Sequence, residues 1–183
     1  VNDLLLGDKN AVMVAARILA YGPEYKAEWT NPQTNEKSMI EFDLSECPFK
    51  ELPSNVDYTN NSFNFKLPAS ENTVTFKLLT GWDDDQVTKE LKSLQKITKT
   101  SGVSPEVTTR LRHAITAIDG NEDKSTIKQY VDNMLSRDSL ALRNEISRLA
   151  PDIELSQMID MEGEMVEVDI PLTVNFFWPD AKS

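Results

Sequence analysis

The apolar positions at the start of the chain predict a helix that is apolar nearly all round. Within residues 11–21 the only charged residue is Arg17. Asp8 is a suitable N-cap, because its side chain accepts hydrogen bonds from the first free amides and its charge suits the positive helix end. Gly22 favours the left-handed conformation that ends helices, and Pro23 prevents continuation. A helix of this composition is expected to be buried on most of its surface.

The middle of this helix contains two small side chains, Ala15 and Ala16. Small residues allow a neighbouring backbone to approach closely. The pattern therefore predicts that both residues are almost fully buried and that the helix is central to the fold. On that hypothesis, Ala16→Asp destabilises the protein by several kcal/mol, because it places an unpaired charge in the core.

Alternating apolar and polar positions predict two β-hairpins after the helix. Residues 26–30 and 38–44 are typical of paired strands, and the turn signals in residues 31–36 separate them. Residues 63–67 and 73–79 predict a second pair of strands. The segment between the two hairpins contains prolines and is expected to be irregular.

From residue 83 to residue 150 the apolar residues recur at helical spacing. The predicted helix faces are marked by Val87, Leu91, Leu94 and Ile97; by Val107, Leu111, Ala114, Ile115 and Ile118; by Ile127, Tyr130, Val131, Met134 and Leu135; and by Leu142, Ile146 and Leu149. The last helix ends at Pro151. Because the connections are short, neighbouring helices are expected to pack antiparallel in a small bundle.

After Pro151 the apolar period returns to two. Residues 155–161 and 165–170 predict a third hairpin, with its turn at Glu162 and Gly163. Residues 172–179 predict one further strand, which follows a proline that breaks the ladder or marks an edge.

The predicted last strand contains three adjacent aromatic residues, Phe176, Phe177 and Trp178. Successive side chains of a strand point to opposite faces, so one side of a sheet cannot bury all three rings. Either both faces are covered or one ring contacts a partner. Phe176, Phe177 and Trp178 are therefore the candidate partner interface.

These elements predict an α+β fold in which β-hairpins flank a small helical bundle. Residues 1–82 and 151–183 are expected to form a β-ribbon core that includes the first helix. Residues 83–150 are expected to form a helical insert.

Composition excludes several classes of function. The 183 residues are 39% hydrophobic and 27% charged, which is typical of a globular protein. The net charge of −11 argues against nucleic acid and anionic membranes as partners, because both require clustered Lys and Arg. No apolar run approaches the roughly 20 residues of a membrane helix. The single cysteine, Cys47, excludes an internal disulfide and is expected to be an inert, partly buried thiol.

The titratable residues predict no catalytic, cofactor-binding or metal site. Residues 119–125 resemble a calcium loop, but Lys124 and Tyr130 stand where an EF-hand needs glycine and glutamate, so an acidic turn before a helix is favoured. The only histidine, His113, has arginine neighbours and is expected on a solvated face without a catalytic role.

A second group of acids lies in the C-terminal hairpin. Its members are Glu162, Glu164, Glu167 and Asp169. A carboxylate pair performs acid–base chemistry in many enzymes. On an alternating strand, however, these residues simply form the solvated face, and this interpretation is favoured.

Several stretches resemble the baseplate hub and hub-assembly proteins of T4-like contractile-tailed bacteriophages. They are residues 5–13 (LLGDKNAVM) with Arg17, 21–25 (YGPEY), 76–81 (FKLLTG) followed by acids, 118–121 (IDGN), and 170–172 (IPL) with 176–179 (FFWP). The resemblance implies a non-enzymatic structural protein of the phage baseplate that binds other baseplate and tail proteins. It implies no cofactor, no small-molecule substrate and no membrane insertion. It also implies synthesis in the host cytoplasm, location in the virion, and a further N-terminal segment before Val1.

Two alternatives to a structural baseplate protein remain open. The first is a tail-assembly chaperone that is absent from the mature virion. The second is a hub-associated cell-wall hydrolase. A hydrolase would need a carboxylate pair in a cleft large enough for sugar.

The resemblance also suggests a lost metal site. In relatives the hairpin after the first helix often contains a Cys-Pro-x-Cys knuckle, and here residues 31–34 keep Pro32 but have no cysteine. The turn at Gly163 is expected to match a second such knuckle. One cysteine and one histidine cannot supply four zinc ligands. We therefore expect a degenerate zinc-ribbon-like pair of hairpins, with Pro32 near Gly163. The residues expected to replace the metal by packing are Trp29, Ile40 and Phe42.

Overall fold

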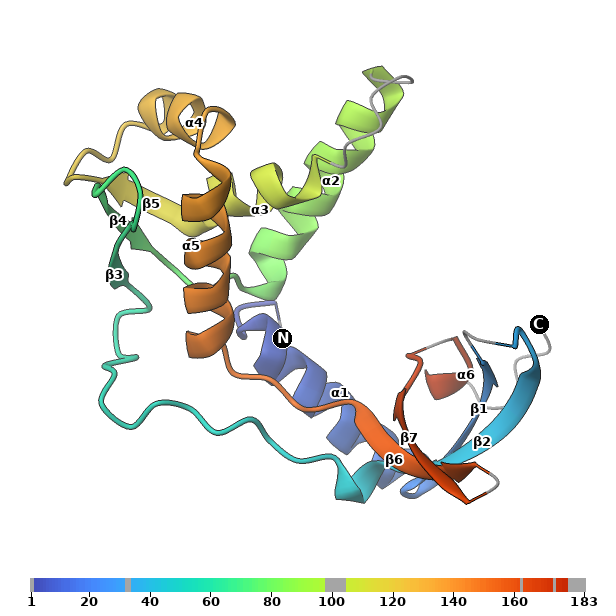
Figure 1. The fold of residues 1–183 in the computed structure, drawn as a ribbon. Coiled ribbons are helices and arrows are strands. Elements are labelled where there is room, and N and C mark those ends of the chain that lie inside the picture. Colours follow the sequence, from blue (N-terminus) through green and yellow to red (C-terminus); the bar gives the residue numbers. More distant parts are fainter. Residues whose placement is uncertain (1, 32–33, 98–104, 162, 173, 178–183) are drawn as a thin grey trace. The chain divides into compact units, whose positions relative to one another are not determined.

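The structure is a computed structural model of the chain, and it describes residues 2–31, 34–97, 105–161, 163–172 and 174–177. It contains helices and small antiparallel sheets, so the expected α+β class is confirmed (Figure 1). The chain divides into two compact units. Unit 1 comprises Val1–Lys9 and Glu51–Pro151, and unit 2 comprises Asn10–Lys50 and Asp152–Ser183.

This division differs from the predicted one, in which residues 83–150 alone form an insert. The hairpin of residues 63–76, which was expected in the β-ribbon core with residues 1–82 and 151–183, belongs to unit 1. The reason is that this hairpin pairs with a strand from the predicted helical region and shares its core. The two units have separate hydrophobic cores, each built from residues of one unit.

Unit 1 contains a three-stranded antiparallel sheet. Its strands are β3 (Phe63–Lys66), β4 (Thr73–Phe76) and β5 (Ile115–Ile118), in the order β3-β4-β5. The prediction that residues 115–118 continue a helix is wrong. In β5 the side chains of Ile115, Ala117 and Ile118 are buried, and the strand pairs with the otherwise free edge of β4. Tertiary pairing thus overrides a pattern that fits both periods.

The helices of unit 1 occur where the sequence predicts them. They are α2 (Gly81–Ile97), α3 (Glu106–Ala114), α4 (Lys124–Asp132) and α5 (Ser136–Leu149). The core joins the sheet residues Val74 and Phe76 to Leu142 and Leu149 of α5, all nearly inaccessible to solvent. Unit 1 is therefore a sheet-and-helix unit rather than a pure helical bundle.

The carboxylate of Asp138 is fully buried in the first turn of α5. It accepts hydrogen bonds from the amide nitrogens of Ala69 (2.7 Å) and Ser70 (3.0 Å). Burial alone would raise the pKa of Asp138, but these hydrogen bonds outweigh it and hold the pKa below its ordinary value. The turn between β3 and β4 is thereby fixed to α5.

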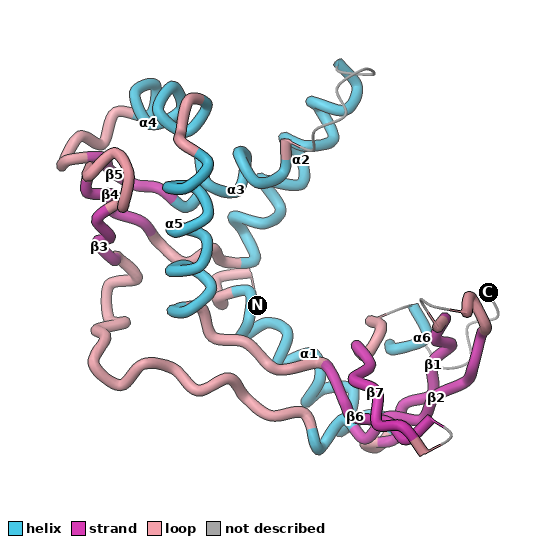
Figure 2. The backbone as a smooth tube through the Cα atoms, in the orientation of Figure 1, coloured by secondary structure: helices cyan, strands magenta, loops and turns pink. Residues whose placement is uncertain are grey.

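Unit 2 consists of two hairpins with most of one long helix. Its elements are α1 (Leu6–Tyr21), β1 (Glu24–Thr30), β2 (Lys37–Asp43), η1 (Leu44–Glu46), β6 (Ser156–Met161), β7 (Glu164–Asp169) and α6 (Val174–Phe177). Both predicted hairpins, β1–β2 and β6–β7, are confirmed. Of the predicted strand over residues 172–179, the part over Val174–Phe177 is wrong, because these residues form a helical turn; residues 173, 178 and 179 lie outside the described residues. Figure 2 shows the strands of the two ribbons and the long loop that leaves η1.

The chain passes between the units at three points, and two of them, after Lys50 and before Asp152, are neighbours in unit 2. Phe49 forms an antiparallel bridge with Ile153, and the amide of Lys50 donates to the carbonyl of Asp152 over 3.0 Å. All of Glu51–Pro151 therefore leaves and re-enters unit 2 at neighbouring points. The described residues include no helix that is long and apolar enough to cross a membrane.

Candidate functional site

The structure buries the first residue of the aromatic candidate interface. The side chain of Phe176 is 0% exposed and meets the ring of Tyr25 edge-on, with 5.1 Å between ring centroids. The Tyr25 hydroxyl donates a hydrogen bond to the carbonyl of Pro171 over 2.7 Å, which holds α6 against β1. Phe176 is thus part of the unit 2 core, so a partner that contacts this aromatic group would have to do so through another of its rings.

The other two aromatic residues have different positions. Phe177 is half-buried and packs edge-on against Phe176, with 5.0 Å between centroids. Trp178 lies outside the described residues. A helical turn, unlike a strand, points neighbouring side chains about a quarter-turn apart, so it buries one ring while the next stays at the rim.

An exposed apolar surface instead lies on α1. Val12 is 48% exposed and Leu19 is 87% exposed, and Ala15 and Ala16 between them are exposed as well. These four residues follow the spacing i, i+3, i+4, i+7 and so share one face, which we call the α1 stripe. The prediction that Ala15 and Ala16 are buried is wrong, because the opposite face of α1 makes the core contacts. That face buries Val14, which is 2% exposed.

Arg17 is the buried polar residue of α1, at 5% exposure. Its guanidinium donates hydrogen bonds to the carbonyl of Gly22 (3.0 Å) and to the carbonyl of Glu24 (3.3 Å). It also stacks over the ring of Tyr21, 4.9 Å from the centroid. Gly22 has φ = 85°, the left-handed cap that the sequence predicts. Arg17 thus ties the end of α1 to the start of β1, a role that its isolated charge did not reveal.

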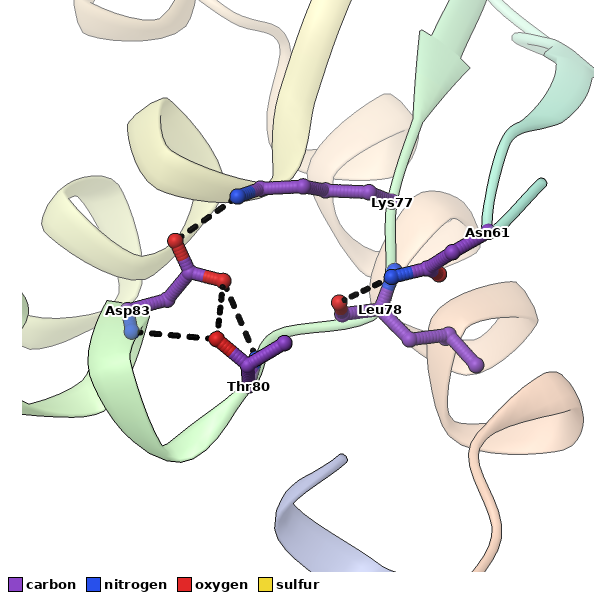
Figure 3. Close-up of polar contacts among 5 residues, drawn as sticks. All are labelled: Asn61, Lys77, Leu78, Thr80 and Asp83. Atoms are coloured by element: carbon purple, nitrogen blue, oxygen red, sulfur yellow. Dashed lines mark hydrogen bonds and ion pairs between the residues drawn. The ribbon is translucent and has the colours of Figure 1, made fainter. Parts of the chain in front are cut away.

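The start of α2 is fixed by a reciprocal cap (Figure 3). The amide and hydroxyl of Thr80 donate to Asp83 Oδ2 over 3.0 Å and 2.9 Å, and the amide of Asp83 donates back to Thr80 Oγ1 over 3.3 Å. Lys77 Nζ lies 2.7 Å from Asp83 Oδ1. Burial alone would raise the pKa of Asp83, but the bonds from Lys77 and Thr80 outweigh it and lower the pKa.

The segment that leads from β4 into this cap is held by the side chain of Asn61. The Asn61 side chain donates to the carbonyl of Leu78 over 3.0 Å (Figure 3). It also accepts from the amide of Leu78 over 2.9 Å, so it pairs with this backbone as a neighbouring strand would. On the far side, the amide of Leu6 donates to the carbonyl of Leu79 over 3.1 Å. Residues 78 and 79 therefore have a fixed position, and they contribute to an apolar hollow of unit 1.

This hollow has a volume of about 270 Å³, and we call it the unit 1 hollow. Its lining residues are Leu5, Leu6, Gly7, Leu78, Leu79, Val107, Arg110, Leu111, Ala114, Arg143, Ile146, Ser147, Ala150 and Pro151. The α3 residues follow the spacing i, i+3, i+4, i+7 and the α5 residues the spacing i, i+3, i+4, so one face of each helix forms a wall. The lining is apolar except for one serine and two arginines.

The two arginines of the unit 1 hollow differ in their partners. Arg110 lies 2.9 Å from a carboxylate oxygen of Asp84 and 3.1 Å from one of Glu106. Arg143 is exposed, and its Nε donates to the carbonyl of Ser139 over 3.3 Å. Among the described residues, no carboxylate lies within ion-pair distance of Arg143. Arg143 therefore offers an uncompensated positive charge at the edge of an apolar surface.

A second, acidic hollow of about 850 Å³ lies in unit 2 and is lined by the β1–β2 and β6–β7 hairpins. Its acidic lining residues are Glu36, Glu41, Asp160, Glu164, Glu167 and Asp169. Glu164, Glu167 and Asp169 are exposed on β7, as predicted for a solvated face, whereas Glu162 lies outside the described residues. Within the described part of the chain, no three His, Cys, Asp or Glu residues are placed to hold a metal ion.

The acidic turn of residues 119–125 has a structural role. Asp119 accepts from the amide of Thr73 (2.7 Å) and from the side chain of Asn72 (2.6 Å), and these bonds lower the pKa of Asp119. Asp123 is the N-cap of α4 and accepts from the amide of Thr126 over 2.8 Å. The favoured interpretation as a helix-starting turn is confirmed, although the turn follows strand β5 rather than a helix.

His113 does not lie on a freely solvated face. Its side chain is 26% exposed, and Nε2 lies 3.1 Å from Glu90 of α2. Arg112 lies 3.3 Å from the other oxygen of Glu90 and also pairs with Asp132 of α4. His113 is thus part of an ion-pair network that joins three helices, because α3 packs between α2 and α4.

Cys47 is buried, as expected. Burial raises the pKa of the Cys47 thiol above its ordinary value, and the Gln157 amide, 3.9 Å from the sulfur, only partly opposes this. A raised pKa keeps the thiol protonated and unreactive.

Comparisons with known proteins do not identify this chain. No protein-family model, no curated protein and no solved structure matches it.

Proposed function

We propose that this protein is a non-enzymatic structural component of a contractile phage tail, in the hub region of the baseplate, and that it acts through contacts with other tail and baseplate proteins. The phage assignment rests on the sequence resemblance. The proposal of protein–protein contact is supported by the α1 stripe, an apolar helix face that unit 2 leaves exposed. Exposed apolar patches on folded proteins mark interaction sites.

The chemistry of the α1 stripe suits a helix of a partner protein. The two alanines leave room for a partner helix to approach at the short end of the usual 8–10 Å range. Within residues 10–21 the only charged side chain is Arg17, and it is buried. The centres of protein interfaces are depleted of charge in the same way.

A complementation experiment tests the proposal. Host cells infected with a phage that lacks this protein are supplied with wild-type protein, with Ala16→Asp, or with Met158→Asp as a matched control. Met158 is 55% exposed on β6, outside the α1 stripe and outside the lining of the acidic hollow, so the control adds the same charge to unit 2. We expect Ala16→Asp to prevent the assembly of baseplates seen by electron microscopy, and Met158→Asp to permit it. Normal assembly with both variants would refute a role for the stripe.

The alternative of an assembly chaperone uses the same contacts but leaves the particle. Mass spectrometry of purified virions distinguishes the two functions, because a structural component is present in the mature virion and a chaperone is not.

The acidic hollow of unit 2 is the observation that favours the second alternative, a cell-wall hydrolase. Glycosidases place two carboxyl groups on opposite sides of the bond that they cleave. The hollow brings Glu41 of β2 and Glu167 of β7 into one lining. A zymogram with bacterial cell wall tests this alternative, and a zone of lysis around the purified protein would replace the structural proposal.

The degenerate zinc-ribbon arrangement is part of the same proposal. Residues that flank the two turns, Asn31 and Thr34 on one side and Met161 and Glu164 on the other, line the same hollow. The unit 2 core contains Ile40 and Phe42 together with Val168 and Ile170, and Trp29 packs against it. Pro32 lies outside the described residues. Elemental analysis of the purified protein tests the proposal, and one zinc ion per chain would contradict it.

A further inference from the structure

We infer that the unit 1 hollow is a docking site for a partner protein segment that presents an apolar side chain next to a carboxylate. This inference concerns a different surface from the α1 stripe. It holds whether or not the protein belongs to a phage tail.

The shape of the hollow follows from fixed elements. One wall is the α3 face of Val107, Leu111 and Ala114, and another is an α5 face that includes Ile146. Leu78 and Leu79 complete the lining in a segment that hydrogen bonds hold on both sides. A hollow built in this way is present before a partner arrives, so binding requires little reorganisation.

The charge at the hollow selects the partner. The chain has a net charge of −11, so most of its surface repels acidic segments. Arg143 is an exception, because it adjoins the apolar lining and has no carboxylate partner among the described residues. A carboxylate on the incoming segment would supply the partner that Arg143 lacks. Arg110, already paired with Asp84 and Glu106, adds positive charge on the other wall.

The size of the hollow favours a protein segment over a free small molecule. Small-molecule sites usually measure about 300–1,000 Å³ and enclose most of the ligand. The unit 1 hollow measures about 270 Å³, and its lining residues Val107 and Arg143 are exposed to solvent. Such a hollow accommodates one anchoring side chain, while the rest of the partner lies on the surrounding surface.

The experiment follows the backbone amide signals of the full ¹⁵N-labelled protein by NMR during titration with four probes at millimolar concentrations. The probes are acetyl-Gly-Phe-Glu-Gly-amide, the same peptide with Gln in place of Glu, the same peptide with Ser in place of Phe, and decanoate. We expect the Phe-Glu peptide to cause saturable shifts at the lining residues. The Phe-Gln peptide is expected to bind about threefold more weakly, as for an exposed ion pair. The Ser-Glu peptide is expected to cause no saturable shifts.

Variants assign the binding to this surface. Arg143→Gln should remove the preference for the Glu peptide over the Gln peptide. Val107→Glu places a negative charge in the lining and should abolish binding of the Phe-Glu peptide. The control is Leu140→Glu, which adds the same charge at a residue of α5 that is 51% exposed and outside the lining. It should bind like the wild type.

Three results would overturn the inference. The first is the absence of saturable shifts at the lining residues with the Phe-Glu peptide. The second is a Glu preference that Arg143→Gln leaves unchanged. The third is saturation by decanoate at lower concentration than by the peptide, which would assign the hollow to a small amphiphile. If Val107→Glu does not fold, the Arg143→Gln comparison still decides the outcome, because Arg143 is exposed.

Discussion

Buried charges at two single positions, Asp138 and Arg17, hold separate segments of the chain together. Each forms its hydrogen bonds with backbone groups: Asp138 accepts from two amides, and Arg17 donates to two carbonyls. Hydrogen bonds that involve a charged group are about twice as strong as neutral ones. These residues therefore contribute more to stability than exposed ion pairs such as Lys26–Glu41.

Replacement of Asp138 by Ala is expected to lower the free energy of unfolding by about 2–3 kcal/mol, because two amides lose a charged acceptor. Asp138→Asn is the control and should cost less, since its side chain keeps one acceptor oxygen. Urea denaturation at pH 7 measures both changes. An alanine variant as stable as the wild type would show that the β3–β4 turn does not depend on α5.

The same variant is expected to show a pH dependence. The pKa of Asp138 is lower in the folded protein than in the unfolded chain, so its contribution to stability is complete above the unfolded pKa of about 3.9. It is lost as the pH falls through the lower folded pKa. The stability difference between wild type and Asp138→Ala should therefore be constant from pH 7 to about pH 5 and shrink below about pH 3.9. A difference that grows on acidification would contradict the assigned direction.

Replacement of Arg17 by Met should also cost about 2–3 kcal/mol, because the carbonyls of Gly22 and Glu24 lose their donor. The stability of Arg17→Lys should lie between those of the wild type and Arg17→Met, since an ammonium group keeps the charge but cannot reproduce the planar fork of a guanidinium. Thermal melting of the three proteins gives the order. If Arg17→Lys and Arg17→Met have the same melting temperature, the charge at this position does not contribute, and only the planar guanidinium geometry matters.

Sequence reasoning missed both residues because it follows apolar periodicity. The charge of Arg17 in an apolar helix appears as an exception to the pattern. Its position five residues before the predicted glycine cap at Gly22 was nevertheless a usable signal. Asp138 gave no local signal, since its partners lie 68 and 69 residues away in the sequence. By contrast, Asp123 caps the helix that begins next to it, and that role was predictable.

At the scale of elements, α1 shows that the sequence can predict a helix without predicting which of its faces is buried. Its C-terminal cap at Gly22 was predictable from local chemistry, whereas its buried face was not, because both faces are apolar. Strand β5 shows the same limit in another form. Its sequence, ITAI, suits a strand or a buried helix segment, and only pairing with β4 decides between them.

Because of the orientation of α1, the same substitution at two nearby positions is expected to change the free energy of unfolding by very different amounts. Ala16→Asp should change the free energy of unfolding by less than about 1 kcal/mol, because the new charge stays in water. Val14→Asp should cost about 3 kcal/mol or more, since Val14 is 2% exposed in the unit 2 core. Urea denaturation distinguishes the two variants. Equal destabilisation by both would mean that the α1 stripe is covered in solution.

For the whole molecule, the structure predicts that unit 2 folds without unit 1. Replacement of Glu51–Pro151 by a few glycines should leave a folded protein, because Lys50 and Asp152 are already joined by a hydrogen bond and the unit 2 core contains no unit 1 residue. A cooperative thermal transition and dispersed NMR signals would confirm this. The free energy of unfolding of this glycine-linked chain should be lower than that of a larger domain, because a small unit buries a smaller fraction of its surface.

Deletion of residues 83–150, the insert predicted from the sequence, is the matched control. It removes β5, helices α3–α5 and all of α2 except its first two residues, so the β3–β4 hairpin loses both the strand that pairs with β4 and the core residues of α5. We expect this shorter chain to aggregate or to remain partly unfolded. Cooperative folding of the control, together with failure of the glycine-linked chain, would refute the division into units.

The neighbouring bridge of Phe49 and Ile153 also fixes an order of events on the ribosome. Synthesis proceeds from the N-terminus at about 5–20 residues per second. Every residue of unit 1 has been made once Pro151 is added, whereas α1 and the first ribbon must then wait for β6, β7 and Phe176. During that interval the nascent chain contains all of unit 1 but only part of the unit 2 core, and the apolar residues of α1 and of the β1–β2 hairpin lack their partners. We therefore expect aggregation and cleavage during synthesis to begin in residues 10–50 rather than in the C-terminal segment.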